Sequence, residues 1–172
     1  MKGSIVKCCA ELVKDYYGEK AWIEILEESG ESKMSIRPIT DVDDQTVFKI
    51  FESICKVLNI SRQEAFDIFG EYWVKIYVPR IYPIFYIQSE SAKQFIMSMD
   101  KVHEHVTSML ENANPPRFKI EEIDEKTIIV DYISKRNLID LFIGLIKGVG
   151  CYYKTSITIK KLSENRVELT FE

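Results

Sequence analysis

Apolar residues recur every three or four positions along the first two-thirds of the chain, which is the spacing of amphipathic helices. The pattern predicts helices over about residues 5–16, 21–28, 43–58, 62–77 and 91–111. Ser61, followed three residues later by Glu64, has the pattern of a capping box at the start of the fourth helix. Pro79 and Pro83 are expected to break the chain after it, because proline lacks the N–H that a helix interior needs.

The hydrophobic period changes to two after the segment 112–116, which contains two adjacent prolines. One hairpin is predicted from strands near 118–120 and 128–133, and a second from strands near 157–159 and 167–171. A helix over about 136–147 should separate them, with Gly148 and Gly150 ending it. The predicted fold class is α+β in a single domain, 1–172: an N-terminal helical part over about 1–112, then an antiparallel sheet with an inserted helix over about 117–172.

Composition and charge narrow the function classes. The chain has 23 Lys and Arg against 27 Asp and Glu, and this net charge of −4 argues against nucleic acid or a polybasic membrane-binding surface. No apolar run approaches the roughly 20 residues that a membrane-spanning helix needs. The four cysteines lack the spacing of a zinc site and are expected to be reduced thiols of a cytoplasmic protein: Cys8, Cys9, Cys55 and Cys151. Aromatic residues make up 12% of the chain, which suits an interior built around something flat and large.

The only two histidines, His103 and His105, lie two residues apart on the long predicted helix and therefore point to different faces. His103 shares its face with apolar residues such as Met99, whereas His105 falls on the polar face. A single buried histidine is most simply a core imidazole bonded to a neighbour. The functional alternative is an axial ligand to a metal held by other means. One imidazole cannot assemble a zinc site, but it is enough for a haem, whose porphyrin supplies four nitrogens.

Three hydrogen-bonding side chains, Tyr132, Ser134 and Arg136, follow the first predicted hairpin at intervals of two. On an extended segment they would share one face. Two hydroxyls and a guanidinium can bind a dianion, such as the two propionates of a haem. The simpler interpretation is a solvated strand edge, with Arg136 opening the next helix.

Taken in order, these segments resemble the H-NOX family, the haem–nitric oxide/oxygen binding domains of bacterial sensors and of soluble guanylate cyclase. The resemblance is carried by residues 1–6, 99–103, 115–117 and 142–146, and it extends over nearly all 172 residues. Tyr132, Ser134 and Arg136 match the family's Y-x-S-x-R signature residue by residue. The ordered set favours the functional interpretation of both the histidine and the polar cluster.

The resemblance implies a noncovalently held haem b, buried between the helical and the sheet part. His103 would be the proximal iron ligand, with Met99 beside the cofactor on the same helix, and Pro116 would press on the porphyrin and distort it. The propionates would be held by Tyr132, Ser134 and Arg136. The distal side, opposite His103, would be lined by Ile5, Cys9, Trp73, Tyr77, Leu141 and Leu145.

The same resemblance bears on which gas is bound. Relatives that bind oxygen stably carry a distal tyrosine where this chain has Leu141, and a polar partner for it where this chain has Trp73. Bound oxygen carries partial negative charge and gains from a hydrogen-bond donor, whereas nitric oxide on ferrous iron needs one much less. An apolar distal pocket is therefore expected to favour nitric oxide and carbon monoxide over oxygen. If the hydroxyl of Tyr77 reaches the ligand, the domain would bind oxygen instead.

The implied activity is sensing, without chemistry on a substrate. Nitric oxide would bind ferrous haem and weaken the iron–His103 bond, the helix that carries His103 would shift, and a signalling partner would read the change. That partner would be a chemotaxis receptor, a histidine kinase or a cyclic-di-nucleotide enzyme, in the same chain or another, since the chain could be a complete small protein or one domain of a longer one.

Two alternative functions stand beside gas sensing. A haem peroxidase would need a distal acid–base pair, for which His105 is badly placed. A module that binds an anion through Tyr132, Ser134 and Arg136 would need no iron.

Overall fold

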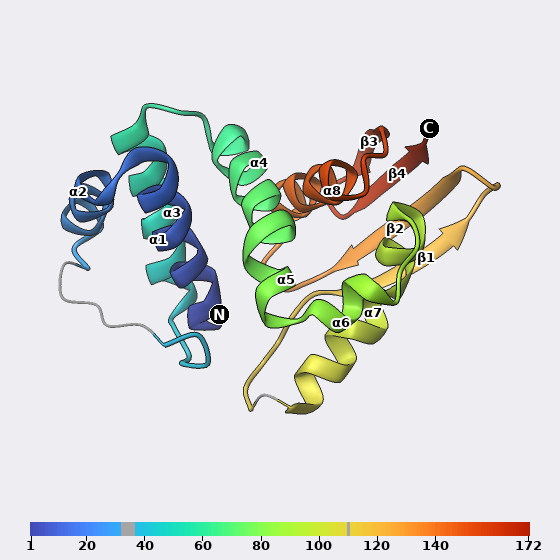
Figure 1. Cartoon of the computed structure of the whole chain (residues 1–172), viewed down its shortest axis with the longest axis horizontal. Helices are drawn as coiled ribbons and strands as arrows, with labels where there is room; N and C mark the ends of the chain where they lie inside the picture. The colour runs from blue at the N-terminus through green and yellow to red at the C-terminus, as the bar shows by residue number, and fades with distance from the viewer. Residues whose placement is uncertain (32–36, 110) are drawn as a thin grey trace. The chain divides into compact units, whose positions relative to one another are not determined.

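The computed structural model of the protein describes residues 1–31, 37–109 and 111–172. The chain divides into two compact units, residues 1–69 and residues 70–172 (Figure 1). Each unit has its own arrangement of helices or strands, and each is described by itself below. The mixture of helices with one antiparallel sheet agrees with the predicted α+β class.

The first unit is helical. It contains α1 (Gly3–Tyr17), α2 (Glu19–Ser29), α3 (Asp44–Leu58) and most of α4 (Arg62–Tyr72). The capping box predicted at the start of α4 is confirmed: the N–H of Glu64 donates to the Ser61 hydroxyl (3.2 Å), and the N–H of Ser61 donates to the Glu64 carboxylate (2.8 Å). The apolar faces of these helices meet in a core that includes Val6, Val13, Ile25, Val47, Ile50, Phe51, Phe66 and Phe69.

The second unit is built on a four-stranded antiparallel sheet. Its strands are β1 (Arg117–Glu122), β2 (Thr127–Ile133), β3 (Ile157–Ser163) and β4 (Arg166–Phe171), in the order β1-β2-β4-β3. Both predicted hairpins are confirmed, and the pairing of β2 with β4 joins them into one sheet. Alternate residues of β2 and β4 are buried, so one face of the sheet belongs to the core.

Helices cover the buried face of this sheet. The long helix α7 (Ala92–Met109) packs against β1, and α8 (Ile139–Tyr153) packs against α7 and β3. The prediction for α7 ran over 91–111, of which residue 110 lies outside the described residues. The core shared by sheet and helices includes Phe95, Ile96, Phe118, Val130, Phe142, Ile146, Val167 and Leu169.

The helix predicted over 136–147 is placed wrongly at both ends. Asn137 lies in a left-handed turn (φ 49°), so α8 begins only at Ile139, and it continues through Gly148 and Gly150 to Tyr153. The two glycines are therefore interior residues of the helix. A Cβ added to Gly148 would lie 2.4 Å from the carbonyl oxygen of Gly70, so this glycine permits a close backbone approach instead of ending the helix.

The segment after α4 also departs from prediction. The helix predicted to run as far as residue 77 changes at Trp73 into a π-helical turn, η1 (Trp73–Tyr77). Pro79 does not break the chain: it lies in the short helix α5 (Val78–Ile81), directly after η1. The break falls on Tyr82 (φ −130°, ψ 56°), immediately before Pro83, which begins α6 (Pro83–Ile87). Proline pushes the residue before it out of helical geometry, so the predicted break is confirmed at Pro83 and wrong at Pro79. Over the described residues, no helix has both the length and the apolar character that crossing a membrane requires.

Candidate functional site

His103 lies on α7 against the turn that precedes β1. Its Nδ1 is 2.8 Å from the carbonyl oxygen of Pro116. Because a carbonyl can only accept, Nδ1 carries the proton and Nε2 keeps its lone pair. Burial lowers the pKa of His103, and the hydrogen bond to Pro116 and the charge of Asp100 oppose this only in part. The side chain is therefore a neutral imidazole at pH 7 with Nε2 as its available ligand atom. His105, in contrast, is exposed, as predicted.

Asp100, one helical turn before His103, ties α7 to β1. The Arg117 guanidinium donates to both carboxylate oxygens, Nε to Oδ1 at 2.7 Å and Nη2 to Oδ2 at 2.6 Å. The backbone N–H of Phe118 also donates to Oδ1, at 2.8 Å. These bonds, chiefly that from Arg117, lower the pKa of Asp100 to about 2. The carboxylate thus holds α7 in place beside Pro116, whose carbonyl orients His103.

Tyr132, Ser134 and Arg136 come together at the end of β2. The sequence suggested that all three lie on one extended segment. This is wrong, because residues 135–136 form a turn. That turn is closed by the N–H of Arg136, which donates to the Ser134 hydroxyl at 3.2 Å. Burial raises the pKa of Tyr132, and this rise is opposed by its hydrogen bond with Ser134 and by the positive charge of Arg136. The Arg136 guanidinium also donates to the carbonyl of Asn114 (2.7 Å). Asn114 belongs to the segment between α7 and β1, so this bond ties the turn to that segment.

One aromatic ring connects this polar cluster with the histidine. The ring of Phe118 lies 5.2 Å from the His103 imidazole and 6.0 Å from the ring of Tyr132, measured between centroids. Phe142 of α8 stacks on Phe118 at 5.0 Å and lies 5.4 Å from Tyr132. His103 and the Tyr132 cluster therefore belong to one neighbourhood of the second unit, although 29 residues separate them in sequence.

Four of the six residues expected on the distal side lie on two packed elements of the second unit. Trp73 and Tyr77 belong to η1, and their rings stack at 5.4 Å with an interplanar angle of 24°. Leu141 and Leu145 are one turn apart on α8, which packs against η1. Tyr77 is buried, whereas the other three side chains are half-buried. The close approach of α8 to Gly70 fixes how these two elements meet.

The remaining expected residues are distributed as follows. Met99 is half-buried, one turn before His103, and packs against the core of the second unit. Pro116 is half-buried beside the imidazole. Ile5 and Cys9 are one turn apart on α1, which belongs to the first unit. Burial raises the pKa of the Cys9 thiol well above its usual range, so this side chain stays a neutral, small apolar group.

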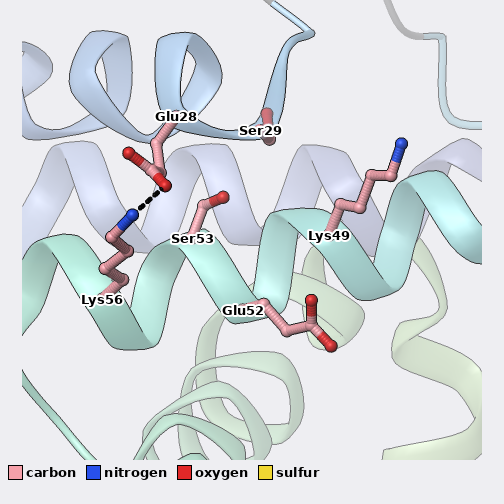
Figure 2. A pocket seen from close by; sticks show the side chains of 6 residues that line it. All are labelled: Glu28, Ser29, Lys49, Glu52, Ser53 and Lys56. Carbon is pink, nitrogen blue, oxygen red and sulfur yellow. Dashed lines mark hydrogen bonds and ion pairs between the residues drawn. The ribbon is translucent and has the colours of Figure 1, made fainter.

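Two surface grooves contain none of the predicted site residues. The first, of about 340 Å³, lies between α2 and α3 and is lined by Glu28, Ser29, Lys49, Glu52, Ser53 and Lys56 (Figure 2). Glu28 pairs with Lys56 inside the groove, and Glu52 lies 4.0 Å from Arg62, which is outside its lining. The second, of about 640 Å³, runs between α6 and the outer face of α7 and includes His105. Within 1–31, 37–109 and 111–172, no three His, Cys, Asp or Glu side chains are grouped so as to hold a metal ion.

Some contributors to this site were not singled out from the sequence. Asp100 precedes His103 by three residues, a spacing that places both on one side of a helix and was available as a signal. The pairing with Arg117 depends on the tertiary fold. Gly70 and Gly148 gave no local signal of their contact, since they lie 78 residues apart.

Comparison with known proteins gives a consistent result. A family model described as Haem-NO-binding matches residues 2–161. Among characterised proteins, the chain is 24% identical over 158 residues to soluble guanylate cyclase gcy-32 of Caenorhabditis elegans, and 23% identical over 155 residues to soluble guanylate cyclase gcy-34 of the same organism. Each match covers 87% of this chain but 23% of the relative, so the chain spans about a quarter of the length of these cyclases.

Solved structures resemble the chain along its whole length. An oxygen-binding H-NOX domain related to soluble guanylate cyclases, solved as its oxygen complex, has a TM-score of 0.85 and 28% identity, with 100% of this chain and 95% of that chain covered. A Cs H-NOX mutant has a TM-score of 0.89 and 28% identity, with 100% and 97% covered. The helices followed by an antiparallel sheet are thus shared with solved domains of the same kind.

Proposed function

This chain belongs to the Haem-NO-binding (H-NOX) family, whose domains bind haem and gases in sensors, and we propose that it binds nitric oxide at a ferrous haem b with His103 as the proximal ligand. The observation that carries the proposal is the state of His103. A neutral imidazole whose Nδ1 is committed to the Pro116 carbonyl presents Nε2 as a metal ligand in a fixed orientation.

The chemistry of the donor set fits such a cofactor. A single imidazole suits an iron whose equatorial ligands come from the porphyrin. The hydroxyls of Tyr132 and Ser134, together with the Arg136 guanidinium, suit the two propionates. Half-buried apolar side chains, among them Met99 and Leu145, suit the ring itself. When bound, the haem would supply an iron atom able to take a diatomic ligand.

The proposed preference for nitric oxide rests on Leu141. A leucine cannot donate a hydrogen bond, so an oxygen molecule beside it would gain little stabilisation. Trp73 stands where oxygen-binding relatives carry a polar partner for their distal tyrosine, and its one donor is the indole N–H. Carbon monoxide, which is less polar when bound, should also be accepted. Tyr77 is the one phenol among the proposed distal residues, and a donor at that position would favour oxygen instead.

We propose that the signal leaves through α7. The buried residues of this helix, Ala92, Phe95 and Ile96, all lie in its first two turns, and most side chains after His103 are exposed. The last turns are therefore held to the second unit chiefly through Asp100 and His103. Loss of an iron bond at Nε2 of His103 would leave the Asp100–Arg117 pair and the Nδ1–Pro116 hydrogen bond as the attachments of these turns, so the end of α7 is the segment that a partner would read. Its partner would be a chemotaxis receptor, a histidine kinase, or a nucleotide cyclase or cyclic-di-nucleotide enzyme, in the same chain or another.

The first test is an absorption spectrum of the purified full chain. The chain is reduced under argon and then exposed separately to air and to nitric oxide. A Soret band that shifts with nitric oxide but not with air is the expected result. A stable shift in air would assign an oxygen-binding domain and point to Tyr77. Absence of a Soret band after haem is added back would refute the haem proposal and leave an anion-binding module at the Tyr132 cluster.

The proximal assignment has its own test. His103→Gly should lose the ferrous spectrum of a histidine-ligated haem, and free imidazole should restore it by occupying the vacated position. His105→Gly is the matched control, because this histidine is exposed two residues away on the same helix. A wild-type ferrous spectrum in His103→Gly, or its loss in His105→Gly, would show that the assignment is wrong.

A further inference from the structure

We propose that Pro79 is a positioning residue for ligand discrimination, because it maintains the π-helical turn η1 that sets the stacked pair Trp73–Tyr77. The inference rests on the proposed function, in which this pair lies on the distal side. It concerns a residue that touches neither the proposed iron ligand nor the polar cluster.

The backbone explains why the turn lies where it does. In a continuous α-helix, residue 79 would donate its N–H to the carbonyl of Lys75, but proline has no N–H and its ring collides with that carbonyl. In η1 the hydrogen bonds instead span five residues, and the N–H of Val78 donates to the carbonyl of Trp73. Ordinary α-geometry resumes directly after Pro79, where the N–H of Tyr82 donates to the carbonyl of Val78 at 2.8 Å. The widened turn is therefore the turn that Pro79 would otherwise disrupt.

The side chains of this turn are held in a defined arrangement. Trp73 stacks on Tyr77, and the Arg80 guanidinium lies 5.7 Å from the centre of the Tyr77 ring. Arg80 also donates from Nε to the carbonyl of Ile76 at 3.0 Å, so it supports the backbone of the same turn. Hence the orientation of both rings depends on the π-helical geometry.

Both ends of the turn are fixed, so it cannot relax without moving the rings. On the upstream side, a Cβ on Gly70 would lie 2.2 Å from the backbone of Gly144, which shows how closely α4 meets α8. On the downstream side stands Pro79. Conversion of η1 to α-helix would change the relative rotation of the two ends by about 100°, the angle of one residue. Trp73 and Tyr77 would then present different atoms to Leu141 and Leu145 on the facing helix α8.

Pro79→Ala tests the inference, and Pro83→Ala is its matched control. Alanine restores the missing N–H at either position, but Pro83 begins α6, where no donor is needed. The chain has two tryptophans, Trp22 in the first unit and Trp73 in the second, so an ¹⁵N-labelled sample gives two indole N–H signals, which Trp73→Phe assigns. Spectra are recorded on the diamagnetic ferrous carbon monoxide complex, or on the chain as purified if it holds no haem.

We expect the Trp73 signal to shift in Pro79→Ala while the Trp22 signal stays in place, and neither to move in Pro83→Ala. Arg80→Met removes the donor to the Ile76 carbonyl and should shift the same Trp73 signal. This variant replaces Pro79→Ala in the test if Pro79→Ala does not fold. The functional readout is the affinity of the reduced protein for carbon monoxide and for nitric oxide, each obtained from association and dissociation rate constants. The ratio of the two affinities should change by about tenfold in Pro79→Ala, the scale expected when one group is displaced in an apolar pocket, and should stay within twofold in Pro83→Ala.

The outcomes separate this inference from the proposed function. If the wild-type chain binds haem and nitric oxide but Pro79→Ala leaves the Trp73 signal unmoved, the positioning role is refuted and the sensor function is untouched. A moved signal with an unchanged affinity ratio would overturn the link to discrimination. If the wild-type chain never acquires a Soret band, the proposed function itself fails, whatever Trp73 does.

Discussion

Gly148→Ala should destabilise the second unit, although alanine is the better helix former. The added methyl group would lie 2.4 Å from the carbonyl oxygen of Gly70 and 2.8 Å from its carbonyl carbon. Ordinary contacts begin near 3.4 Å, so α8 and the end of α4 would have to separate by about 1 Å. Overpacking of this kind costs roughly 1–3 kcal/mol, whereas replacing a helical glycine by alanine gains about 1 kcal/mol. The added Cβ is fixed to the backbone of α8 and meets the backbone of Gly70, so no side-chain rotation can relieve the clash. The cost of overpacking is therefore expected in the upper part of the range of roughly 1–3 kcal/mol.

We therefore expect a net loss of about 1–2 kcal/mol in the free energy of unfolding, or a Tm lower by roughly 3–6 °C for a chain of this size. Thermal melts followed by far-UV circular dichroism, with urea titrations beside them, measure the change. Gly150→Ala is the comparison variant: it gains the same helix propensity, and its methyl group would lie 2.9 Å from the backbone carbonyl oxygen of Thr155, a milder clash than the 2.4 Å contact at Gly148. Its loss of stability should therefore be smaller than that of Gly148→Ala. If Gly148→Ala proves as stable as Gly150→Ala, the close approach of α8 to Gly70 is not a constraint on this fold.

Two further predictions concern single contacts. Because the Arg117 bond lowers the pKa of Asp100 to about 2, this pair stabilises the fold at neutral pH, and its contribution should fall as pH drops from about 4 towards 2. Asp100→Asn should lower the free energy of unfolding by about 1 kcal/mol at pH 7, a modest loss because the pair is partly open to solvent. It should also flatten the pH dependence of the free energy of unfolding between about pH 4 and pH 2. An unchanged pH profile would contradict the role of the pair. Lys154 caps α8 in the left-handed region (φ 53°), so Lys154→Gly should raise the free energy of unfolding by about 1 kcal/mol. Lys154→Ala, which keeps the strained backbone, should give no such gain in the same denaturation assay.

Local periodicity was sufficient for most elements of the fold. The amphipathic spacing of α1, α3 and α7 and the alternation in both hairpins predicted the helices and strands within a few residues. These patterns are readable because they arise from one face of an element meeting one core. What they did not contain is the pairing of β2 with β4, or the division of the chain after residue 69. Both depend on contacts between segments that are distant in sequence.

For the candidate site, the sequence indicated which residues we propose for the chemistry but not how they are held. The helical phase of His103 and its contrast with His105 followed from spacing alone. Its hydrogen bond to the Pro116 carbonyl, 13 residues away, and the Asp100–Arg117 pair that fixes the same turn required the three-dimensional structure. The order of Tyr132, Ser134 and Arg136 was informative even though the assumed extended geometry was wrong, because the turn at 135–136 still brings the three side chains together.

Two of the local predictions that failed share a physical cause. Gly148 was interpreted as a helix end and Pro79 as a chain break, which are the usual meanings of these residues in isolation. In the folded chain, the first lets α8 approach α4, and the second accompanies a π-helical turn immediately after α4. Local rules tend to fail where a backbone arrangement is needed for something other than stability. Here both exceptions act on the same pair of elements, those that carry Trp73 and Leu141. If that geometry governs discrimination between gases, substitutions at Gly148 and at Pro79 should both change the ratio of nitric oxide to carbon monoxide affinity, whereas Asp100→Asn should act on the proximal side and leave that ratio close to wild type.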